Sequence, residues 1–334
     1  MASSSSSAPL GITMGDPAGV GVELALKCWL ARDDENLPPF VLIADPKIVA
    51  GQAEQLSLTV PLAIIDDVAQ AADRFAQALP VLPVAGSNEA AQTIGAIELG
   101  TGLALSGALS GLVTLPINKH KLYEDGFAHP GHTEFLGFLC ETDEAPLMML
   151  AIPGLRTVLS TIHIPLKDVP TALAKLGPDG LVTLAERVIA ALIQDFGIDQ
   201  PRLAIAGLNP HAGERGSIGT EETDIIEPAI AALQHKGFVV DGPAPADTLF
   251  HETARQDYDA VLCHYHDQAL IPLKTLNFHE GVNITLGLPI IRTSPDHGTA
   301  YDIAGQGIAD PRSLISAIRM ASQIVAARAT GTTD

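Results

Sequence analysis

The sequence predicts an α/β protein with two lobes, and three observations support this fold class. At 334 residues the chain is longer than one hydrophobic core usually allows, which favours two lobes with a cleft between them. Hydrophobic residues make up 47% of the chain but aromatic residues only 4%, so the core must be built mainly from Ala, Leu, Ile and Val. Short apolar runs also alternate with segments of helical spacing, as in a parallel sheet covered by helices.

The alternation begins near the N-terminus. Residues 10–14 form a predicted strand, which leads through the turn GDPAGVG at 15–21 into an amphipathic helix over 22–31. The turn has three glycines but matches neither GxGxxG nor GxxxxGK, so it is neither a Rossmann fingerprint nor a P-loop. Both a structural tight turn and a ligand-binding turn fit these residues.

The next segments continue the same rhythm and predict a doubly wound sheet. They are strands over 40–44, 81–84 and 112–117 and helices over 67–79 and 90–109. A further predicted helix opens at His132 and Thr133. Thr133 suits either a helix N-cap or a phosphate site, because free N–H groups at helix N-termini bind both side-chain oxygens and anions.

Three later strands each end in a histidine. The predicted strands over 157–166, from 202 and over 260–266 present His163, His211 and His266. Three imidazoles on rigid elements are the ligand set of an open zinc-type catalytic site, provided that the strands are neighbours. The chain has 11 histidines, so a chance triple of hydrogen-bonded histidines is an open alternative.

Residues around these histidines add to the metal hypothesis. His264 lies two residues before His266 and would share its strand face, so it could chelate in its place. Asp247 or Asp267 could orient such ligands from behind.

Charge and cysteine content restrict partners and compartment. The net charge of −20 argues against nucleic acid or an anionic membrane surface as partner, and makes Lys274 and Arg292 the best candidates for binding an anionic substrate. Three widely spaced cysteines favour reduced thiols in a cytoplasmic protein. Residues 1–9 lack the features of a signal peptide and are expected to be a disordered lead-in, and no apolar run reaches membrane-spanning length.

Seven motifs occur in order between about Leu10 and Met320. They are GITMGDPAGVGVE, PINKHK, HPGHTEFL, GLNPHAGERG, GPAPADTLF, YHDQALIPLKTL and GVNITLGLPIIRTSPDHGTAYDIAGQG. Together they resemble the 4-hydroxythreonine-4-phosphate dehydrogenase family of pyridoxal phosphate biosynthesis. The resemblance implies two α/β/α domains of the isocitrate and isopropylmalate dehydrogenase type with a cleft between them. It also implies a homodimer whose partner subunit completes each active site.

The domain boundaries follow from where these motifs fall. We expect residues 10–130 and 285–334 to form a first domain that carries the cofactor loop. Residues 131–284 are expected to form a second domain with the metal ligands and the dimer interface.

The resemblance also implies a role for each motif residue. One divalent ion, such as zinc, magnesium or cobalt, is expected at His163, His211 and His266. Substrate contacts are expected at His132, Thr133, Lys274, Asn283 and Arg292. The segment from Asp296 resembles the HGSAPDIAGKG-like loop of isopropylmalate dehydrogenases, which implies NAD or NADP contacts at His297, Gly298, Thr299, Ala300 and Asp302.

Three residues are expected to take part in catalysis, namely Lys274, Asp267 and Asp247. The general base stays open between Lys274, Asp267 and His132. His264 stands where relatives usually carry an apolar residue, so the resemblance argues against it as a ligand. Arg215 and Ser217, and NFHE at 277–280, depart from the common pattern, which affects loop conformation and fine substrate preference rather than the ligands.

The implied reaction is metal-dependent oxidation of a small phosphorylated amino acid, 4-phosphooxy-L-threonine, by NAD(P), followed by decarboxylation. Two alternatives stay open. One is a related dehydrogenase of threonate or erythronate phosphate or of a cis-dihydrodiol carboxylate. The other is a non-redox metal lyase or aldolase, or a phosphate-binding relative, because one site geometry can serve unrelated chemistry.

Overall fold

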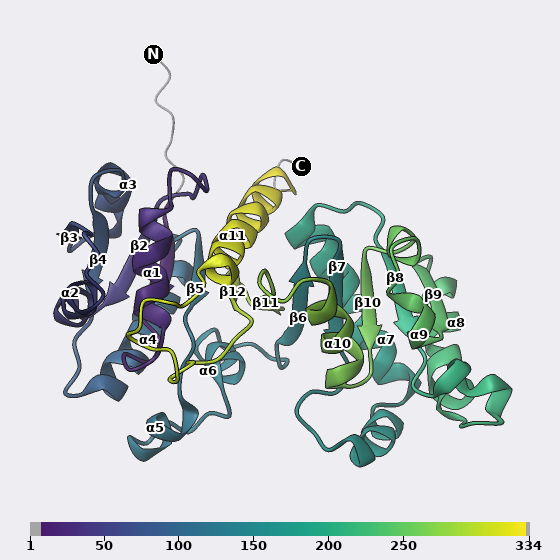
Figure 1. Cartoon of the computed structure of the whole chain (residues 1–334). Helices are drawn as coiled ribbons and strands as arrows, with labels where there is room; N and C mark the ends of the chain where they lie inside the picture. The colour runs from purple at the N-terminus through teal and green to yellow at the C-terminus, as the bar shows by residue number, and fades with distance from the viewer. Residues whose placement is uncertain (1–7, 332–334) are drawn as a thin grey trace. The chain divides into compact units, whose positions relative to one another are not determined.

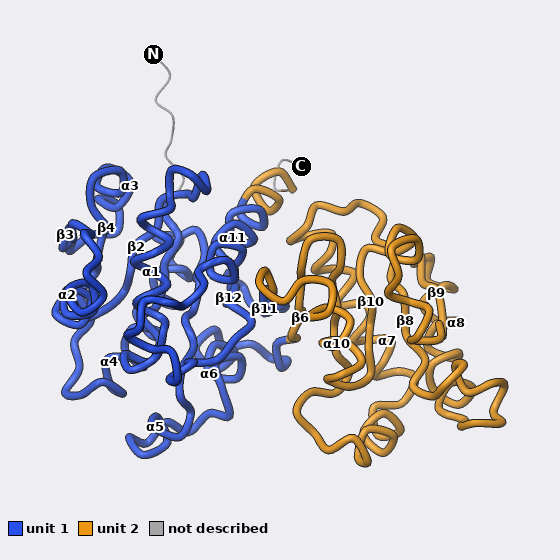
Figure 2. Tube along the Cα trace, viewed as in Figure 1, with its two compact units in different colours: residues 1–146, 282–325 blue, residues 147–281, 326–334 orange. Residues whose placement is uncertain are grey.

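The computed structural model describes residues 8–331, so most of the lead-in expected at 1–9 lies outside the described residues. The chain folds into two compact units (Figure 2). Unit 1 comprises the chain up to Pro146 together with Val282–Val325, and unit 2 comprises Leu147–Gly281 and the residues from Ala326. Each unit contains a mainly parallel sheet with helices packed against it, so the predicted α/β class is confirmed (Figure 1).

The strands of unit 1 lie in the order β3-β4-β2-β1-β5-β12-β11. Neighbours are parallel except β11 and β12. The strands are β1 (Leu10–Thr13), β2 (Phe40–Ala44), β3 (Leu62–Ile64), β4 (Leu79–Pro83), β5 (Gly111–Thr114), β11 (Val282–Leu286) and β12 (Arg292–Pro295). The four central parallel strands β2, β1, β5 and β12 are buried along their whole length. Burial on both faces explains why β2, β1 and β5 read as mainly apolar rather than alternating, whereas β12 buries the polar residues Arg292, Thr293 and Ser294.

Helices cover this sheet. They are α1 (Gly21–Leu30), α2 (Pro46–Gln55), α3 (Ala71–Phe75), α4 (Glu89–Leu105), α5 (Lys119–Glu124), α6 (His132–Leu139) and α11 (Arg312–Gly331), whose last residues belong to unit 2. Side chains set the start of several helices, as where Asn88 accepts a hydrogen bond from the N–H of Ala91 at 2.8 Å. The helix expected over 67–79 is shorter, because a 3₁₀ turn at Val68–Gln70 precedes α3.

The strands of unit 2 lie in the order β6-β7-β10-β8-β9. They are β6 (Leu147–Ile152), β7 (Leu155–Leu159), β8 (Arg202–Ala206), β9 (Val239–Ala244) and β10 (Ala260–Cys263). β6 and β7 form an antiparallel hairpin and the other pairs are parallel. The carboxyl ends of the parallel strands β7, β10 and β8 therefore meet at one edge of the sheet.

The helices of unit 2 are α7 (Val169–Phe196), α8 (Glu227–His235), α9 (Ala246–Leu249) and α10 (His266–Leu276). α7 is interrupted at Gly177, whose φ of 67° breaks the helical path. Irregular helical turns span Leu166–Asp168, Pro210–Gly216, Glu222–Ile226 and Ala254–Gln256.

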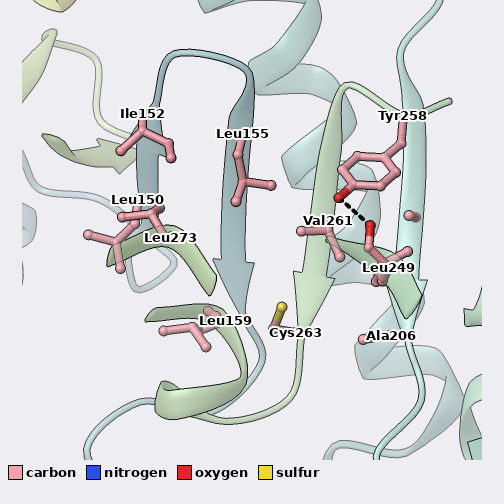
Figure 3. Packing of buried hydrophobic residues seen from close by; sticks show 12 residues of the cluster. Leu150, Ile152, Leu155, Leu159, Ala206, Leu249, Tyr258, Val261, Cys263 and Leu273 are labelled. Carbon is pink, nitrogen blue, oxygen red and sulfur yellow. Dashed lines mark hydrogen bonds between the residues drawn. The ribbon is translucent and has the colours of Figure 1, made fainter. Parts of the chain in front are cut away.

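One hydrophobic cluster of unit 2 lies between its sheet and α10. Leu150, Leu155, Val261 and Leu273 pack together, and the hydroxyl of the buried Tyr258 donates to the carbonyl of Leu249 at 2.9 Å (Figure 3). Burying apolar side chains of this size stabilises each by roughly 1.5–3 kcal/mol.

Unit 1 includes the segment 131–146. α6 lies in this segment and contacts α4, and its Phe135 and Leu136 are buried. Over the described range 8–331, no helix is both long and apolar enough to cross a bilayer.

Candidate active site

Arg292 opens β12 and is only 4% exposed. Its Nε and Nη2 donate to the hydroxyl oxygen of Thr114, at 3.0 and 2.7 Å, and its Nη1 donates to that of Thr285 at 2.8 Å. Burial lowers the pKa of the guanidinium to about 10. A buried cation held by neutral hydroxyls retains an attraction for an anion, because hydroxyl partners do not cancel its charge.

His132 is the first residue of α6, and its Nε2 is buried without a hydrogen-bond partner within the described chain. The pKa of His132 is held well below its usual value, chiefly by burial and then by the positive charges of Arg292 and Lys119. The Oδ1 atom of Asn283, on β11, is likewise buried and unpartnered within residues 8–331. Unit 1 thus combines two cations with the unpartnered Nε2 of His132, which suits an anionic ligand, whereas the oxygen of Asn283 is an acceptor and suits a donor group of a ligand.

Thr133 is the second residue of α6, and the N-cap is Gly131. The alternative of Thr133 as N-cap is therefore wrong. Lys119 was not singled out from the sequence, although it lies in the quoted PINKHK motif. A side chain at Gly131 would place its Cβ 3.1 Å from Nζ of Lys119, so this glycine lets the cation approach the start of α6.

The predicted cofactor loop, His297 to Asp302, packs against the glycine-rich turn. The N–H of Val20 donates to the carbonyl of Thr299 at 3.0 Å, and a Cβ at Gly19 would lie 2.9 Å from the same oxygen. Gly15 has a φ of +67°, which favours glycine. The turn therefore has a structural role in supporting the loop. Gly298 has open space around its Cα, and the Nδ1 atom of His297 lies 2.9 Å from the carbonyl of Gly298.

Tyr301 anchors the same loop through residues that sequence reasoning missed. Its hydroxyl donates to Asp16 and accepts from Nδ2 of Asn118 at 2.7 Å. Lys121 lies 3.3 Å from Asp16 and 5.1 Å from the centre of the Tyr301 ring. Asp16, Asn118 and Lys121 also line a cavity of about 410 Å³. The one sequence signal for this network is that Asp16 lies in the motif GITMGDPAGVGVE and Lys121 in the motif PINKHK.

In unit 2, His163 and His266 lie together, with ring centres 5.6 Å apart. Both line a cavity of about 310 Å³. His163 lies on a loop rather than on the predicted strand, because β7 ends at Leu159. His266 is the first residue of α10, and its Nδ1 is 2.7 Å from Oδ1 of Asp267. Since a carboxylate only accepts, Nδ1 carries the proton and Nε2 keeps a lone pair that can bind a metal.

His211 lies on the irregular turn after β8. From His211 through Gly216 every residue has positive φ, including Ala212, Glu214 and Arg215. Glu222 holds the base of this loop: its carboxylate accepts from the N–H of Asn209 at 2.7 Å and from Nδ2 of Asn209 at 2.9 Å. Burial acts to raise the pKa of Glu222, but these hydrogen bonds, together with those from the backbone N–H groups of Glu222 and Leu208, lower it.

The three predicted metal ligands are not gathered in one cluster. Among residues 8–331, no three His, Cys, Asp or Glu side chains lie close enough to hold one ion. The structure therefore brings His163 and His266 together but does not add His211 to the pair.

His264 is fully buried and both of its ring nitrogens have partners. Nε2 lies 2.7 Å from the carbonyl of Ala206, and Nδ1 lies 3.2 Å from Oγ of Ser160. Burial lowers the pKa of His264 to about 4. With both nitrogens engaged, this side chain cannot replace His266 as a ligand.

The remaining predicted catalytic residues lie near α10. Asp247, on α9, and Asp267 line a cavity of about 460 Å³. Lys274 lies in the last turn of α10, and its Nζ is 5.2 Å from the centre of the Phe278 ring.

Comparisons with known proteins agree with the motifs. A sequence profile described as pyridoxal phosphate biosynthetic protein PdxA matches residues 35–321. The 4-hydroxythreonine-4-phosphate dehydrogenase of Caulobacter vibrioides is 52% identical, covering 96% of this chain and 99% of that protein.

Solved structures give the same result. The crystal structure of 4-hydroxythreonine-4-phosphate dehydrogenase from Klebsiella pneumoniae matches with a TM-score of 0.85 at 36% identity, covering 97% of this chain and 99% of that one. A terephthalate 1,2-cis-dihydrodiol dehydrogenase from Burkholderia xenovorans matches with a TM-score of 0.62 at 28% identity, covering 94% and 97%. The prediction of a dehydrogenase-family enzyme is confirmed, and this chain belongs to the pyridoxal phosphate biosynthetic protein PdxA family.

Proposed function

We propose that this enzyme oxidises 4-phosphooxy-L-threonine to 2-amino-3-oxo-4-phosphooxybutanoate with NAD or NADP and one divalent metal ion. The product loses carbon dioxide to give 3-amino-2-oxopropyl phosphate, a step of pyridoxal 5'-phosphate biosynthesis. Within the family, the observation that supports this substrate best is the buried Arg292 beside a neutral, unpartnered His132.

The anionic groups of the substrate have suitable partners in unit 1. Arg292 and Lys119 supply positive charge, and His132 can donate a hydrogen bond from Nε2 if that nitrogen carries the proton. Thr133 and Asn283 add polar contacts, and Lys274 is a further proposed substrate-binding residue. Because Thr114 and Thr285 fix the guanidinium in advance, little reorganisation is needed when an anion binds.

We assign the divalent ion to His163 and His266, with His211 as third ligand. The Nδ1 proton shared with Asp267 orients His266 and leaves Nε2 for a metal, so the pair of His163 and His266 suits an ion, whereas His211 does not lie with this pair among the described residues. When bound, the ion would act as a Lewis acid toward the oxidised carbinol oxygen and the keto acid. We further propose a homodimer with shared active sites, in which ligands on different subunits complete one site. Zinc, magnesium and cobalt are the candidate ions.

The dinucleotide is assigned to His297, Gly298, Thr299, Ala300 and Asp302. The open space at Gly298 and the anchoring of the loop by Tyr301 support this assignment, since a fixed loop with exposed backbone suits a nucleotide. When bound, the dinucleotide would accept the hydride from the carbinol carbon.

The strongly lowered pKa of His132 argues against it as general base, because a weakly basic imidazole takes a proton poorly. Lys274 and Asp267 therefore stay as the candidates, and Asp247 supports the same region from α9. We place the enzyme in the cytoplasm, in line with three cysteines that form no disulfide.

A second candidate function is oxidation of a cis-dihydrodiol carboxylate, since a dihydrodiol dehydrogenase is 28% identical over 94% of this chain. Such a substrate has a carboxylate but no phosphate. Oxidation of threonate or erythronate phosphate is the related possibility among phosphorylated substrates. A requirement for the substrate phosphate would distinguish the proposed reaction from oxidation of a dihydrodiol carboxylate. A requirement for the amino group would distinguish it from oxidation of threonate or erythronate phosphate.

The proposal is tested by following nicotinamide reduction with 4-phosphooxy-L-threonine before and after chelation. We expect activity to be lost on chelation and restored by zinc, magnesium or cobalt. Full activity of the metal-free protein would contradict the metal assignment, and no reduction of NAD or NADP in the metal-loaded protein would contradict the function.

A further inference from the structure

We propose that Tyr301 is a positioning residue that holds the start of α5 and thereby places the cation of Lys119 beside His132 and Arg292. These three side chains, Lys119, His132 and Arg292, are called the Arg292 cluster below. The inference rests on the anion-binding role proposed for this cluster. It gives Tyr301 a second task besides anchoring its own loop, and one phenolic hydroxyl carries that task.

α5 depends on its neighbours for its position. It has six residues, and isolated helices shorter than about 12–15 residues are only marginally stable. Leu122 is buried, whereas Lys119 is exposed. The helix begins at Asn118, whose Oδ1 accepts from the N–H groups of His120 and Lys121 at 3.0 and 3.4 Å. The place of Lys119, the next residue, therefore depends on what holds Asn118.

The hydroxyl of Tyr301 holds Asn118 from outside the helix. Nδ2 of Asn118 donates to this hydroxyl at 2.7 Å, so the cap uses its oxygen for α5 and its amide N–H for Tyr301. The hydroxyl in turn donates to the carboxylate of Asp16. Asp16 is only 4% exposed, and its Oδ1 also accepts from the N–H of Ala18 at 2.9 Å. Tyr301 thus joins α5 to a side chain that is fixed in the glycine-rich turn.

A second contact from α5 reaches the same carboxylate. Nζ of Lys121 lies 3.3 Å from Oδ1 of Asp16 and 5.1 Å from the centre of the Tyr301 ring. The far end of the helix is held separately, where Nδ2 of Asn88 donates to Asp125 at 2.9 Å. Loosening the Tyr301 contact should therefore move the first turn of α5 more than its last.

Lys119 extends from this first turn to the start of α6. A Cβ atom added at Gly131, the N-cap of α6, would lie 3.1 Å from Nζ of Lys119. The positive charge of Lys119 also contributes to the lowered pKa of His132, after burial and the charge of Arg292. Because a lysine side chain is long and flexible, placing its ammonium costs less entropy when its backbone is already fixed. A fixed Asn118 supplies that condition.

The loop that carries Tyr301 has a further attachment that does not use the hydroxyl. The backbone N–H of Val20 donates to the backbone carbonyl of Thr299 at 3.0 Å. Removing the hydroxyl should therefore release α5 while leaving the loop on the turn. Tyr301→Phe makes this change and keeps the ring. Since Tyr301 is 42% exposed, we expect the variant to fold.

Hydrogen exchange of the protein free of metal and dinucleotide tests the contact itself. We expect Tyr301→Phe to exchange faster than wild type over residues 119–126, with little change over 297–300. The matched control is Tyr258→Phe, which removes a phenolic hydroxyl that donates to the carbonyl of Leu249 in unit 2. Unchanged exchange over 119–126, or the same increase there in the control, would overturn the proposal.

Calorimetric titration of the same protein with inorganic phosphate tests the consequence for anion binding. We expect the dissociation constant of Tyr301→Phe to rise by roughly 3- to 10-fold, the effect of losing about one hydrogen bond, and that of Tyr258→Phe to match wild type. Phosphate affinity of Tyr301→Phe equal to wild type would overturn the positioning role. Wild-type protein that binds no phosphate would instead contradict the anion-binding role of the cluster, and hydrogen exchange would still decide whether Tyr301 holds α5.

A double-mutant cycle with Lys119→Met shows whether Tyr301 acts through Lys119. If it does, adding Tyr301→Phe to Lys119→Met should raise the phosphate dissociation constant by less than about twofold, because the cation that Tyr301 positions is already gone. An equal rise in the presence and absence of Lys119 would overturn the proposal, since Tyr301 would then act by another route.

Asn118→Ser tests the same contact from the side of α5. Serine can still accept from the N–H groups at the start of the helix, but it has no amide N–H for Tyr301. We expect this variant to weaken phosphate binding as Tyr301→Phe does, and the two changes together to have less than the sum of their effects. Full additivity would contradict a shared hydrogen bond.

Discussion

The Arg292 cluster of unit 1, formed by Arg292, Lys119 and His132, and the histidine pair of unit 2, formed by His163 and His266, are built in different ways. Arg292 is buried and fixed by two threonine hydroxyls before any ligand arrives. His163 and His266 lie on a loop and at a helix start, with side chains open to a cavity. His211 sits on a separate loop whose residues adopt unfavourable left-handed conformations.

This difference indicates where each region draws its stability. The Arg292 cluster is preorganised by the core of unit 1. Its buried charge lowers the stability of the ligand-free protein, and a bound anion would offset this free-energy cost. The histidine loops depend on hydrogen bonds behind them, from Asp267, Glu222 and His264. Non-glycine residues in the left-handed region cost about 1–2 kcal/mol each, so such a loop persists only when its surroundings hold it.

We expect the largest effect from a substitution that removes Arg292 from the Arg292 cluster. Arg292→Met removes the buried cation, and we expect kcat/KM for the phosphorylated substrate to fall by roughly 30- to 4,000-fold, because losing one side of a buried charge contact costs about 2–5 kcal/mol. Steady-state dinucleotide reduction measures this. The control is Arg319→Met, which removes an arginine from an exposed pair with Glu35. Comparable losses in both variants would show that Arg292 has no special role.

We expect the next largest effect from a substitution behind the histidine pair. Asp267→Asn replaces the carboxylate that accepts the Nδ1 proton of His266, so we expect metal affinity to drop roughly 10- to 100-fold while anion affinity is retained. Chelator competition measures the first and phosphate titration of the metal-free protein the second. Asp310→Asn, at an exposed pair with Arg312, serves as control. Unchanged metal affinity would remove Asp267 from this role.

We expect a smaller effect from a substitution that weakens the hydrogen bonds at the base of the loop carrying His211. Glu222→Gln replaces a charged acceptor of two Asn209 hydrogen bonds, and we expect stability to fall by about 1–3 kcal/mol. Urea unfolding of the metal-free protein measures it. Glu221→Gln is the matched control. Glu221 accepts a hydrogen bond from Nδ2 of Asn209, whereas Glu222 accepts from both Nδ2 and the backbone N–H of this asparagine. Equal losses in the two variants would argue against a special role for Glu222.

The smallest effect concerns pH. The folded protein keeps the pKa of His264 at about 4, below the ordinary value of 6.5, and shifts His132 in the same direction. As pH falls through 6.5 the unfolded chain binds these protons before the folded one does, so stability falls with pH in this window. Replacing His264 with Gln should reduce the slope of the unfolding free energy against pH between about pH 7 and about pH 5. The reduction should correspond to up to about one bound proton. An unchanged slope would contradict the burial of a neutral imidazole.

Much of this fold could be predicted because buried parallel strands leave continuous apolar runs. The strand histidines were noticed for the same reason, since each follows such a run. Their arrangement could not be predicted: β7 ends at Leu159, and the left-handed turn after His211 contains Ala212, Glu214 and Arg215, residues that give no sign of that conformation. Contacts such as Tyr301 with Asp16 join segments 285 residues apart, and no local pattern reports them.

We propose that this enzyme recognises a phosphorylated amino acid and oxidises its carbinol. The most direct test compares kcat/KM for 4-phosphooxy-L-threonine, unphosphorylated 4-hydroxythreonine, erythronate phosphate and a cis-dihydrodiol carboxylate, read as NAD or NADP reduction by the metal-loaded protein. We predict the highest value for 4-phosphooxy-L-threonine, with strong loss when either its phosphate or its amino group is absent. Equal or higher activity on either alternative substrate would contradict the account.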